Sequence, residues 1–315
     1  MRTPFTSKSG LKRLLVTCSL GFLFSSVTAQ QAPAPPEDLR HGDAEVRCER
    51  CLWWTLGGAV GLTGGTLLAL DKAWYSDYDR GPLHAFNDGG EWLQMDKAGH
   101  FFSAYTLGAW GHGTMRHCEV RPSRATLLGG SFGLAFLTGV ELLDGTSAAW
   151  GFSWWDMAAN VAGAGFFMAQ QAHWHEQRVR VKLSAVPTAY AEQRPDLLGE
   201  GFTERLLKDY NGHTVWLSTN VDLFLPTMGA PKWLNIAVGY GAEGMTSAFP
   251  QTTGGGEVRD PRYREFYLSP DMDLTRLPVR SKALRTVLFV LNSIKLPMPA
   301  LEFSEGAVKG HWLHF

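Results

Sequence analysis

Four apolar stretches of helical length dominate the first half of the chain once its N-terminal leader is set aside. They run over 52–70, 98–115, 125–140 and 157–172. Each is too long for a single strand and long enough for roughly four to five turns of α-helix. Glycine and alanine recur three or four positions apart within them, which lets helix backbones approach closely. The pattern predicts an up-and-down, small-residue-rich bundle of four helices.

The character of the chain changes near residue 173. Beyond it the apolar runs are shorter, as at 214–219, where the composition is that of a strand. The segment 281–295 has the pattern of an amphipathic helix. We therefore expect a mainly α fold, with the helical bundle over 51–175 and a mixed α/β C-terminal region over 176–315.

The N-terminus has the features of an export signal. Basic residues precede an apolar segment over 14–27, and Val27-Thr28-Ala29 offers small residues for cleavage. We expect a signal peptide over 1–29 and a Pro- and Ala-rich tether over 30–50. Thr17 is a poor residue before the cysteine of a lipid-attachment motif, so we do not expect lipidation at Cys18. The chain is therefore predicted to be exported from the cytoplasm into an oxidising compartment.

Charge and hydropathy exclude some classes of protein and leave two arrangements open. A net charge of -1 gives no electrostatic basis for binding nucleic acid. A mean hydropathy of -0.11 excludes a polytopic transporter. Basic residues gather after the second and fourth apolar stretches, which is the charge pattern expected at the cytoplasmic ends of membrane spans. However, only the stretch 52–70 approaches the roughly 20 apolar residues that a span requires. The sequence is compatible with a membrane-embedded bundle and with a compact periplasmic one.

Three cysteines follow the leader, namely Cys48, Cys51 and Cys118. In an oxidising compartment the C-x-x-C pair can form a local disulfide. The surrounding sequence lacks the βαβ pattern of a thioredoxin-like redox protein, and no second pair completes a zinc site. We expect either a small Cys48–Cys51 disulfide or two ordinary thiols.

Polar residues stand at the ends of the four apolar stretches. In an antiparallel bundle with short connections, these ends meet at one pole. Asp96 and His100 are four residues apart and share a helix face, as do Asp156 and Asn160. The candidate polar site consists of Asp96, Lys97, His100, Glu141, Asp144, Ser153, Asp156 and Asn160.

Two functional interpretations compete with a structural one. A divalent metal such as zinc, iron or manganese can be held by His100 together with Asp96, Glu141 and Asp156. Alternatively, His100 and a carboxylate can act as a general acid/base pair. In the structural interpretation, which we favour on the sequence alone, Ser153 and Asp156 form a capping box and Lys97 pairs with Glu141.

The combination of motifs resembles a known family. The motifs are Asp96-Lys97-x-x-His100-Phe101, Glu141-x-x-Asp144, Gly151-x-Ser153-Trp154-x-Asp156 and Asn160-x-x-Gly163. They resemble the predicted periplasmic lipoproteins of unknown function typified by YfiM, and the flanking Trp74-Tyr75-Ser76 resembles the larger Bacteroidetes-type members. A more distant similarity to VanZ-like membrane proteins rests on the same order of acid, His and Asn. The resemblance covers about 74–165. It implies a location in the envelope of a Gram-negative bacterium, on the periplasmic side, and it implies no established activity.

Together these observations predict an exported cell-envelope protein that acts as a membrane-associated scaffold or binds a lipid or glycolipid. The enzymatic alternative is a metal-assisted envelope hydrolase that uses His100, Glu141 and Asp156. The expected partner is the envelope membrane or a lipid, and nucleic acid is not expected.

Overall fold

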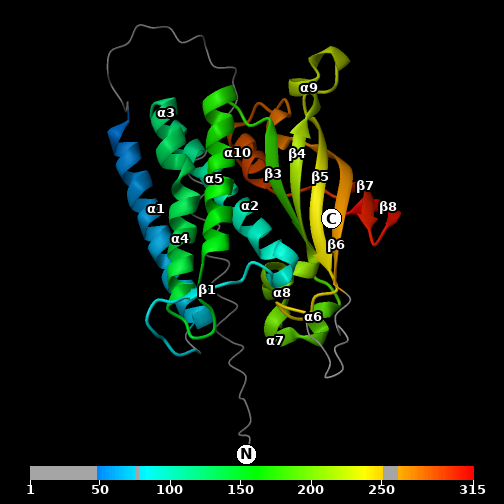
Figure 1. The fold of residues 1–315 in the computed structure, drawn as a ribbon. Coiled ribbons are helices and arrows are strands. Elements are labelled where there is room, and N and C mark those ends of the chain that lie inside the picture. The colour runs from blue at the N-terminus through cyan, green and yellow to red at the C-terminus, as the bar shows by residue number, and fades with distance from the viewer. Residues whose placement is uncertain (1–47, 76–77, 251–261) are drawn as a thin grey trace, which may run out of the picture.

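The computed structural model describes residues 48–75, 78–250 and 262–315. The expected signal peptide and nearly all of the tether lie outside these residues. Long helices stand side by side in one layer, and a six-stranded antiparallel sheet forms the other (Figure 1). Helix α2 runs between the two layers and contacts the other long helices and the first strands of the sheet.

The helical layer is built by the four apolar stretches predicted from the sequence. Its elements are α1 (Glu49–Leu70), η2 (Asp71–Tyr75), α2 (Met95–His117), α3 (Pro122–Arg124), η4 (Ala125–Gly129), α4 (Phe132–Gly145) and α5 (Trp154–Trp174). Two short strands, β1 (Ala85–Phe86) and β2 (Phe152–Ser153), pair in parallel beside the helix ends. Glycine explains the close contact of α2 with α5, because a Cβ on Gly163 would lie 2.2 Å from the backbone oxygen of Phe101.

The sheet follows the chain order without crossovers. Its strands are β3 (Val179–Ala185), β4 (His213–Asn220), β5 (Leu234–Glu243), β6 (Tyr263–Met272), β7 (Met298–Ser304) and β8 (Ala307–His314). Short helices fill the connections: α6 (Tyr190–Gln193), α7 (Pro195–Leu198), α8 (Phe202–Lys208), α9 (Val221–Phe224) and α10 (Lys282–Leu291). Single helical turns occur at η3 (Glu91–Gln94), η5 (Tyr210–Gly212), η6 (Pro226–Met228) and η7 (Leu274–Arg276).

The prediction of a mainly α fold is wrong. The protein is a mixed α/β structure, because six strands of seven to ten residues form one continuous sheet after residue 178. These strands are difficult to recognise in the sequence, because charged and small polar residues occupy alternate positions and interrupt the apolar runs. Asp271 and Glu302, for example, interrupt apolar segments in β6 and β7 and are buried there.

A shared core joins the helical layer to the sheet. Tyr105 of α2 and Phe167 of α5 pack against Val181 of β3 and Val215 of β4. The Tyr105 hydroxyl also donates to the backbone oxygen of Val179 at 3.3 Å. The first two strands of the sheet are therefore covered by helices.

The cysteine pairing differs from the local one that the C-x-x-C spacing suggested. Cys51 in α1 is bonded to Cys118, which directly follows α2, and Cys48 is an exposed free thiol. The local Cys48–Cys51 disulfide is thus wrong. The observed bond fixes the first turn of α1 to the end of α2, and such a bond is typical of proteins from oxidising compartments.

Candidate functional site

The polar cluster lies where the lower ends of the helices in Figure 1 meet. Asp96, Lys97 and His100 occupy the first turns of α2, and Asp156 and Asn160 occupy those of α5, while Glu141 lies in the last turns of α4. Since α2 and α5 run in the direction opposite to α4, the start of two helices and the end of the third share one pole. The structure therefore places these predicted site residues next to one another.

His100 is held by an amide on one side and faces carboxylates on the other. Its Nδ1 lies 3.0 Å from Oδ1 of Asn160. An amide oxygen only accepts hydrogen bonds, so in this arrangement Nδ1 donates to Asn160 and Nε2 is the ring nitrogen that faces the carboxylates. Nε2 lies 3.9 Å from Oδ1 of Asp96 and 3.8 Å from Oε1 of Glu141. A proton on Nε2, or a cation between Nε2 and the carboxylates, would make these contacts attractive.

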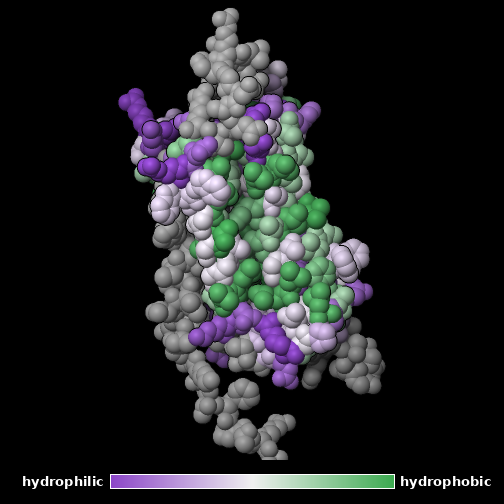
Figure 2. All heavy atoms as spheres, turned by 90° about the vertical axis from the view of Figure 1, so that its left-hand side faces the viewer, coloured by the Kyte–Doolittle hydropathy of each residue, from purple (hydrophilic) through white to green (hydrophobic). Residues whose placement is uncertain are grey.

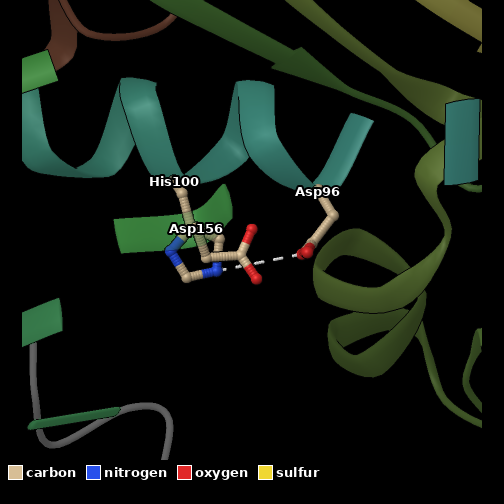
Figure 3. Close-up of side chains that lie close together, drawn as sticks. All are labelled: Asp96, His100 and Asp156. Carbon is tan, nitrogen blue, oxygen red and sulfur yellow. Dashed lines mark ion pairs between the residues drawn. The ribbon is translucent and has the colours of Figure 1, made fainter. Parts of the chain in front are cut away.

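Three of these side chains have the spacing of a metal-ligand set. One ligand atom each from Asp96, His100 and Asp156 lies within 4.8 Å of the other two. Figure 3 shows the three side chains pointing toward one another, two from α2 and one from α5. Nearby, Glu141 is 1% exposed, and among the described residues none donates a hydrogen bond to its Oε1. One imidazole and two carboxylates with a further buried carboxylate form a donor set suited to zinc, iron(II) or manganese(II).

Lys97 supplies a fixed positive charge at the edge of this group. In the described part of the chain, its Nζ forms ion pairs with Asp88, with Asp96 at 3.0 Å and with Asp156 at 3.0 Å. The expected partner, Glu141, is not among them. Lys97 is 12% exposed at its side chain, so water screens these pairs only weakly.

Negative charge exceeds positive charge in the cluster. One lysine and one histidine face five carboxyl groups, those of Asp88, Asp96, Glu141, Asp144 and Asp156. Burying several carboxylates without compensation is costly, so the excess must be neutralised by bound protons or by a cation.

The pKa values of Asp96 and Asp156 show how strongly Lys97 favours the ionised form of each carboxyl group. Burial raises the pKa of Asp156 to about 8, and the charge of Asp96 adds to this. Burial acts in the same direction on Asp96, but the charges of His100 and Lys97 outweigh it and hold the pKa of Asp96 below its usual range. Burial also raises the pKa of Glu141 to about 8, so Asp156 and Glu141 are the carboxyls that a proton or a cation relieves most.

Ser153 connects three elements of the site. Its hydroxyl accepts from the backbone N–H of Asp156 at 3.0 Å, which caps α5, and donates to Oδ1 of Asp88 at 2.6 Å. Its own N–H donates to Oε2 of Glu141 at 3.0 Å. Ser153 caps the helix as predicted, whereas the Asp156 carboxylate forms an ion pair with Lys97.

Three contributors to the cluster were not among the candidate residues. Asp88 follows β1 and is brought to Ser153 by the pairing of β1 with β2. Tyr210, from the C-terminal region, donates to Oδ1 of Asp96 at 2.6 Å, and Tyr75 donates to Oδ1 of Asp144 at 2.6 Å. The turn sequence at 87–90 could have indicated Asp88, but no local signal relates Tyr210 to a residue 114 positions away.

A left-handed turn introduces the first site residue. Trp92, Leu93 and Gln94 have φ angles of 47°, 50° and 67°, a region that costs each side chain about 1–2 kcal/mol. The sheet holds this turn, since the Tyr240 hydroxyl donates to the backbone oxygen of Leu93 and Arg264 donates to Oε1 of Gln94 at 2.6 Å. The position of Asp96 therefore depends on contacts from strands β5 and β6.

Comparison with known proteins matches the middle of the chain to one family. Residues 84–171 match the model described as "Predicted periplasmic lipoprotein (DUF2279)". The match includes all eight candidate residues and Asp88, but not Tyr75 or Tyr210. A search of curated proteins and a search of solved structures gave no match. The family supports a periplasmic, cell-envelope location and has no known function, so a functional role for the cluster stays a prediction.

Proposed function

We propose that this envelope protein is a metal-assisted hydrolase, with a divalent cation held by Asp96, His100 and Asp156. The observation that carries the proposal is the position of His100 Nε2, which faces carboxylate oxygens of Asp96 and Glu141 within 4 Å. The hydrogen bond from Nδ1 to Asn160 fixes the ring in this orientation, as outer hydrogen bonds commonly do for metal-bound histidines. A cation between these groups would also offset the excess negative charge.

Each neighbouring residue then has a distinct role. A bound divalent cation would supply Lewis acidity and lower the pKa of a coordinated water. Glu141 is buried, and one of its oxygens accepts no hydrogen bond from the described residues, so it is placed to take a proton from that water as a general base. Lys97 would favour the ionised form of Asp96, and Tyr210 would hold the Asp96 carboxylate in place. A bound cation would have to displace the proton that burial favours on Asp156, since metal ligands must be deprotonated.

Metal analysis tests this proposal directly. The purified protein, dialysed against a buffer with trace zinc and manganese, is expected to retain one divalent cation per chain. His100→Ala should lose it, whereas His173→Ala, which removes an exposed histidine from the last turn of α5, should not. Hydrolysis of model esters and phosphoesters should follow the metal content and return when the metal is restored. Wild-type protein without stoichiometric metal would refute the proposal.

A second candidate, a membrane-associated scaffold or lipid-binding protein, is supported by the surface of α1. This helix has no buried residue, and Val60 and Leu68 are each 72% exposed. Figure 2 shows apolar side chains gathered in the middle of this side of the molecule, with hydrophilic residues above and below. By length and composition, α1 and the segment Pro122–Gly145 could each cross a membrane.

Membrane fractionation separates association with the membrane from the chemistry of the cluster. The full chain should stay with the membrane after a carbonate wash if α1 contacts lipid. Replacing Val60 and Leu68 together with Asp should release it while leaving the metal content unchanged. Retention of that double variant would contradict the role of α1 but not the metal site.

A further inference from the structure

The helix α5 buries its polar side chains and exposes apolar ones. Asp156, Asn160 and Gln170 are all buried. Between residues 154 and 169, every exposed position is apolar, namely Trp154, Trp155, Ala158, Val161, Ala162 and Ala169. A surface helix that faces water shows the reverse arrangement, with its polar residues outside.

The neighbouring helices α1 and α4 show the same inversion. After Arg50, the exposed positions of α1 are Trp53, Trp54, Gly57, Gly58, Val60, Gly61, Gly65 and Leu68. No charged residue occurs from 51 to 70, a length of about 30 Å at 1.5 Å per residue, which matches the hydrocarbon core of a bilayer. Figure 2 shows this side of the molecule, apolar in the middle and hydrophilic at both ends. Acyl chains fit an apolar surface of that height.

Exposed apolar side chains reach the level of the polar cluster on two helices. On α4, Leu142 directly follows the buried Glu141 and is 48% exposed. On α5, Trp155 directly precedes the buried Asp156 and is 58% exposed. Consecutive residues of a helix point roughly 100° apart, so each carboxyl group turns inward where its neighbour turns outward. The cluster and the end of the apolar surface therefore lie at the same height along these helices.

Helix α1 ends at that height, and tryptophans gather there. Asp71, which directly follows α1, pairs with Arg80, and Arg80 also donates to the backbone oxygen of Leu143 in α4 at 3.2 Å. The Trp155 ring is held in its exposed position, since its Nε1 donates to Oδ1 of Asn87 at 3.2 Å. The exposed tryptophans at this end are Trp150, Trp154 and Trp155. Tryptophan is enriched where hydrocarbon meets the lipid headgroups.

On the basis of the proposed hydrolase, we propose that its substrate is a phospholipid of a bilayer that covers α1, α4 and α5, with the headgroup beside Asp96 and His100. These two side chains are 18% and 16% exposed, so a headgroup can reach them while its acyl chains lie against the apolar positions. In the hydrolysis, the oxygen of water bonds to the phosphorus or acyl carbon, and the bond from that atom to the leaving oxygen breaks. Glu141 takes one proton from the water and passes it to the leaving oxygen, and the other proton stays on the acid product.

The depth of the site in the bilayer is measured with the full chain in vesicles of phosphatidylethanolamine and phosphatidylglycerol. Cys18 and Cys48 are replaced by Ser, which leaves the Cys51–Cys118 disulfide intact. A fluorophore is attached at one of three exposed positions: Ala158→Cys beside the site, Val60→Cys in the middle of α1, or Lys232→Cys before β5. Quenching by nitroxides on the lipid headgroup and in the middle of the acyl chain is then compared, and this readout does not depend on bound metal.

Headgroup nitroxides should quench the Ala158→Cys label several-fold more than chain nitroxides, and the order should reverse at Val60→Cys. The Lys232→Cys label should be quenched by neither. Stronger quenching of Ala158→Cys by chain nitroxides would overturn the inference, because the site would then lie below the headgroups. Absence of quenching there would overturn it too, since water or a protein such as a second copy would then cover α5.

Turnover separates the substrate from the chemistry. The metal-loaded protein should release products from the phospholipid vesicles, and the double variant Leu142→Gln, Val161→Gln should lower that rate several-fold. The same variant should keep its metal content and its hydrolysis of soluble p-nitrophenyl butyrate. Leu291→Gln, a matched change at a 43% exposed leucine of α10, should alter none of these.

The outcomes distinguish the substrate from the proposed hydrolase. Hydrolysis of the soluble ester without release of products from vesicles would overturn the phospholipid substrate and leave the hydrolase standing. Equal vesicle hydrolysis by the wild type and the double variant would also overturn it, because the apolar surface would then not present the lipid. Protein without stoichiometric metal and without turnover on either substrate would overturn both.

Discussion

Replacement of Lys97 by Met gives the sharpest test of how the negative charge of the polar cluster is compensated. Lys97 Nζ lies 3.0 Å from an oxygen of Asp96 and 3.0 Å from one of Asp156. At an effective dielectric constant of about 20, each contact is worth roughly 5 kcal/mol before desolvation is subtracted. Removing one partner of a buried ion pair costs about 3–5 kcal/mol, and the slight exposure of Lys97 places the expected loss near the lower end, at about 3 kcal/mol.

The loss is measured as the change in the free energy of unfolding, from urea titrations followed by tryptophan fluorescence at pH 7.5 with a chelator present. Lys232→Met is the matched control, since Lys232 is exposed and its replacement should cost less than about 0.5 kcal/mol. Adding a saturating divalent cation should reduce the cost of Lys97→Met, because the cation neutralises the same carboxylates. A loss below about 1 kcal/mol without metal would refute the idea that this ammonium balances the cluster.

Three further perturbations probe the surroundings of the site. Burial raises the pKa of Glu91 to about 7, with Lys97 opposing and Asp88 adding to the shift. The native state thus binds this proton more tightly than the unfolded chain, and stability should fall between about pH 4.5 and 7. Other buried carboxyls with raised pKa values, such as Glu141 and Asp156, contribute to the same fall. Glu91→Gln should therefore reduce it and add about 1–2 kcal/mol at pH 8 after allowance for partial exposure, as read from urea titrations across pH. Tyr210→Phe should lower the free energy of unfolding by about 2 kcal/mol, because it removes a hydrogen bond to a charged group. Tyr78→Phe, at an exposed position, is the control, and an equal loss in both variants would contradict this prediction. The Cys51–Cys118 disulfide closes a separation of 67 residues. Its reduction should lower the midpoint of thermal unfolding and the free energy of unfolding, the latter by up to about 4 kcal/mol. An unchanged midpoint would argue against this bond.

The helices and their polar ends could be predicted from the sequence because both signals are local. Apolar length and small-residue spacing located α1, α2 and α5 within three residues of their observed ends, whereas the third stretch, predicted over 125–140, covers η4 and most of α4. The motif containing Ser153 likewise predicted the cap of α5. Such features depend on residues three or four positions apart, which a sequence displays directly.

The sheet and the disulfide could not be predicted in the same way, because they depend on distant partners. Alternating residues over 265–274 suggest a strand, but nothing in the segment shows that Asp271 is fully buried against Lys182 from β3. Cys51 has a nearer cysteine in the chain but is bonded to one 67 residues away. In both cases the deciding contact comes from an element far along the sequence, and alternation read from a single strand does not reveal which side is covered.

The candidate site itself combines both kinds of information. The side chains proposed as metal ligands come from helices that the sequence identifies, but the left-handed turn before Asp96 is held by Tyr240 and Arg264 of the sheet. Tyr210, also from the C-terminal region, binds the Asp96 carboxylate directly. Non-glycine residues hold such backbone angles only where surrounding structure enforces them. The geometry around His100 is therefore a property of both layers, and substitutions in the sheet that loosen this turn should weaken cation binding without changing any ligand.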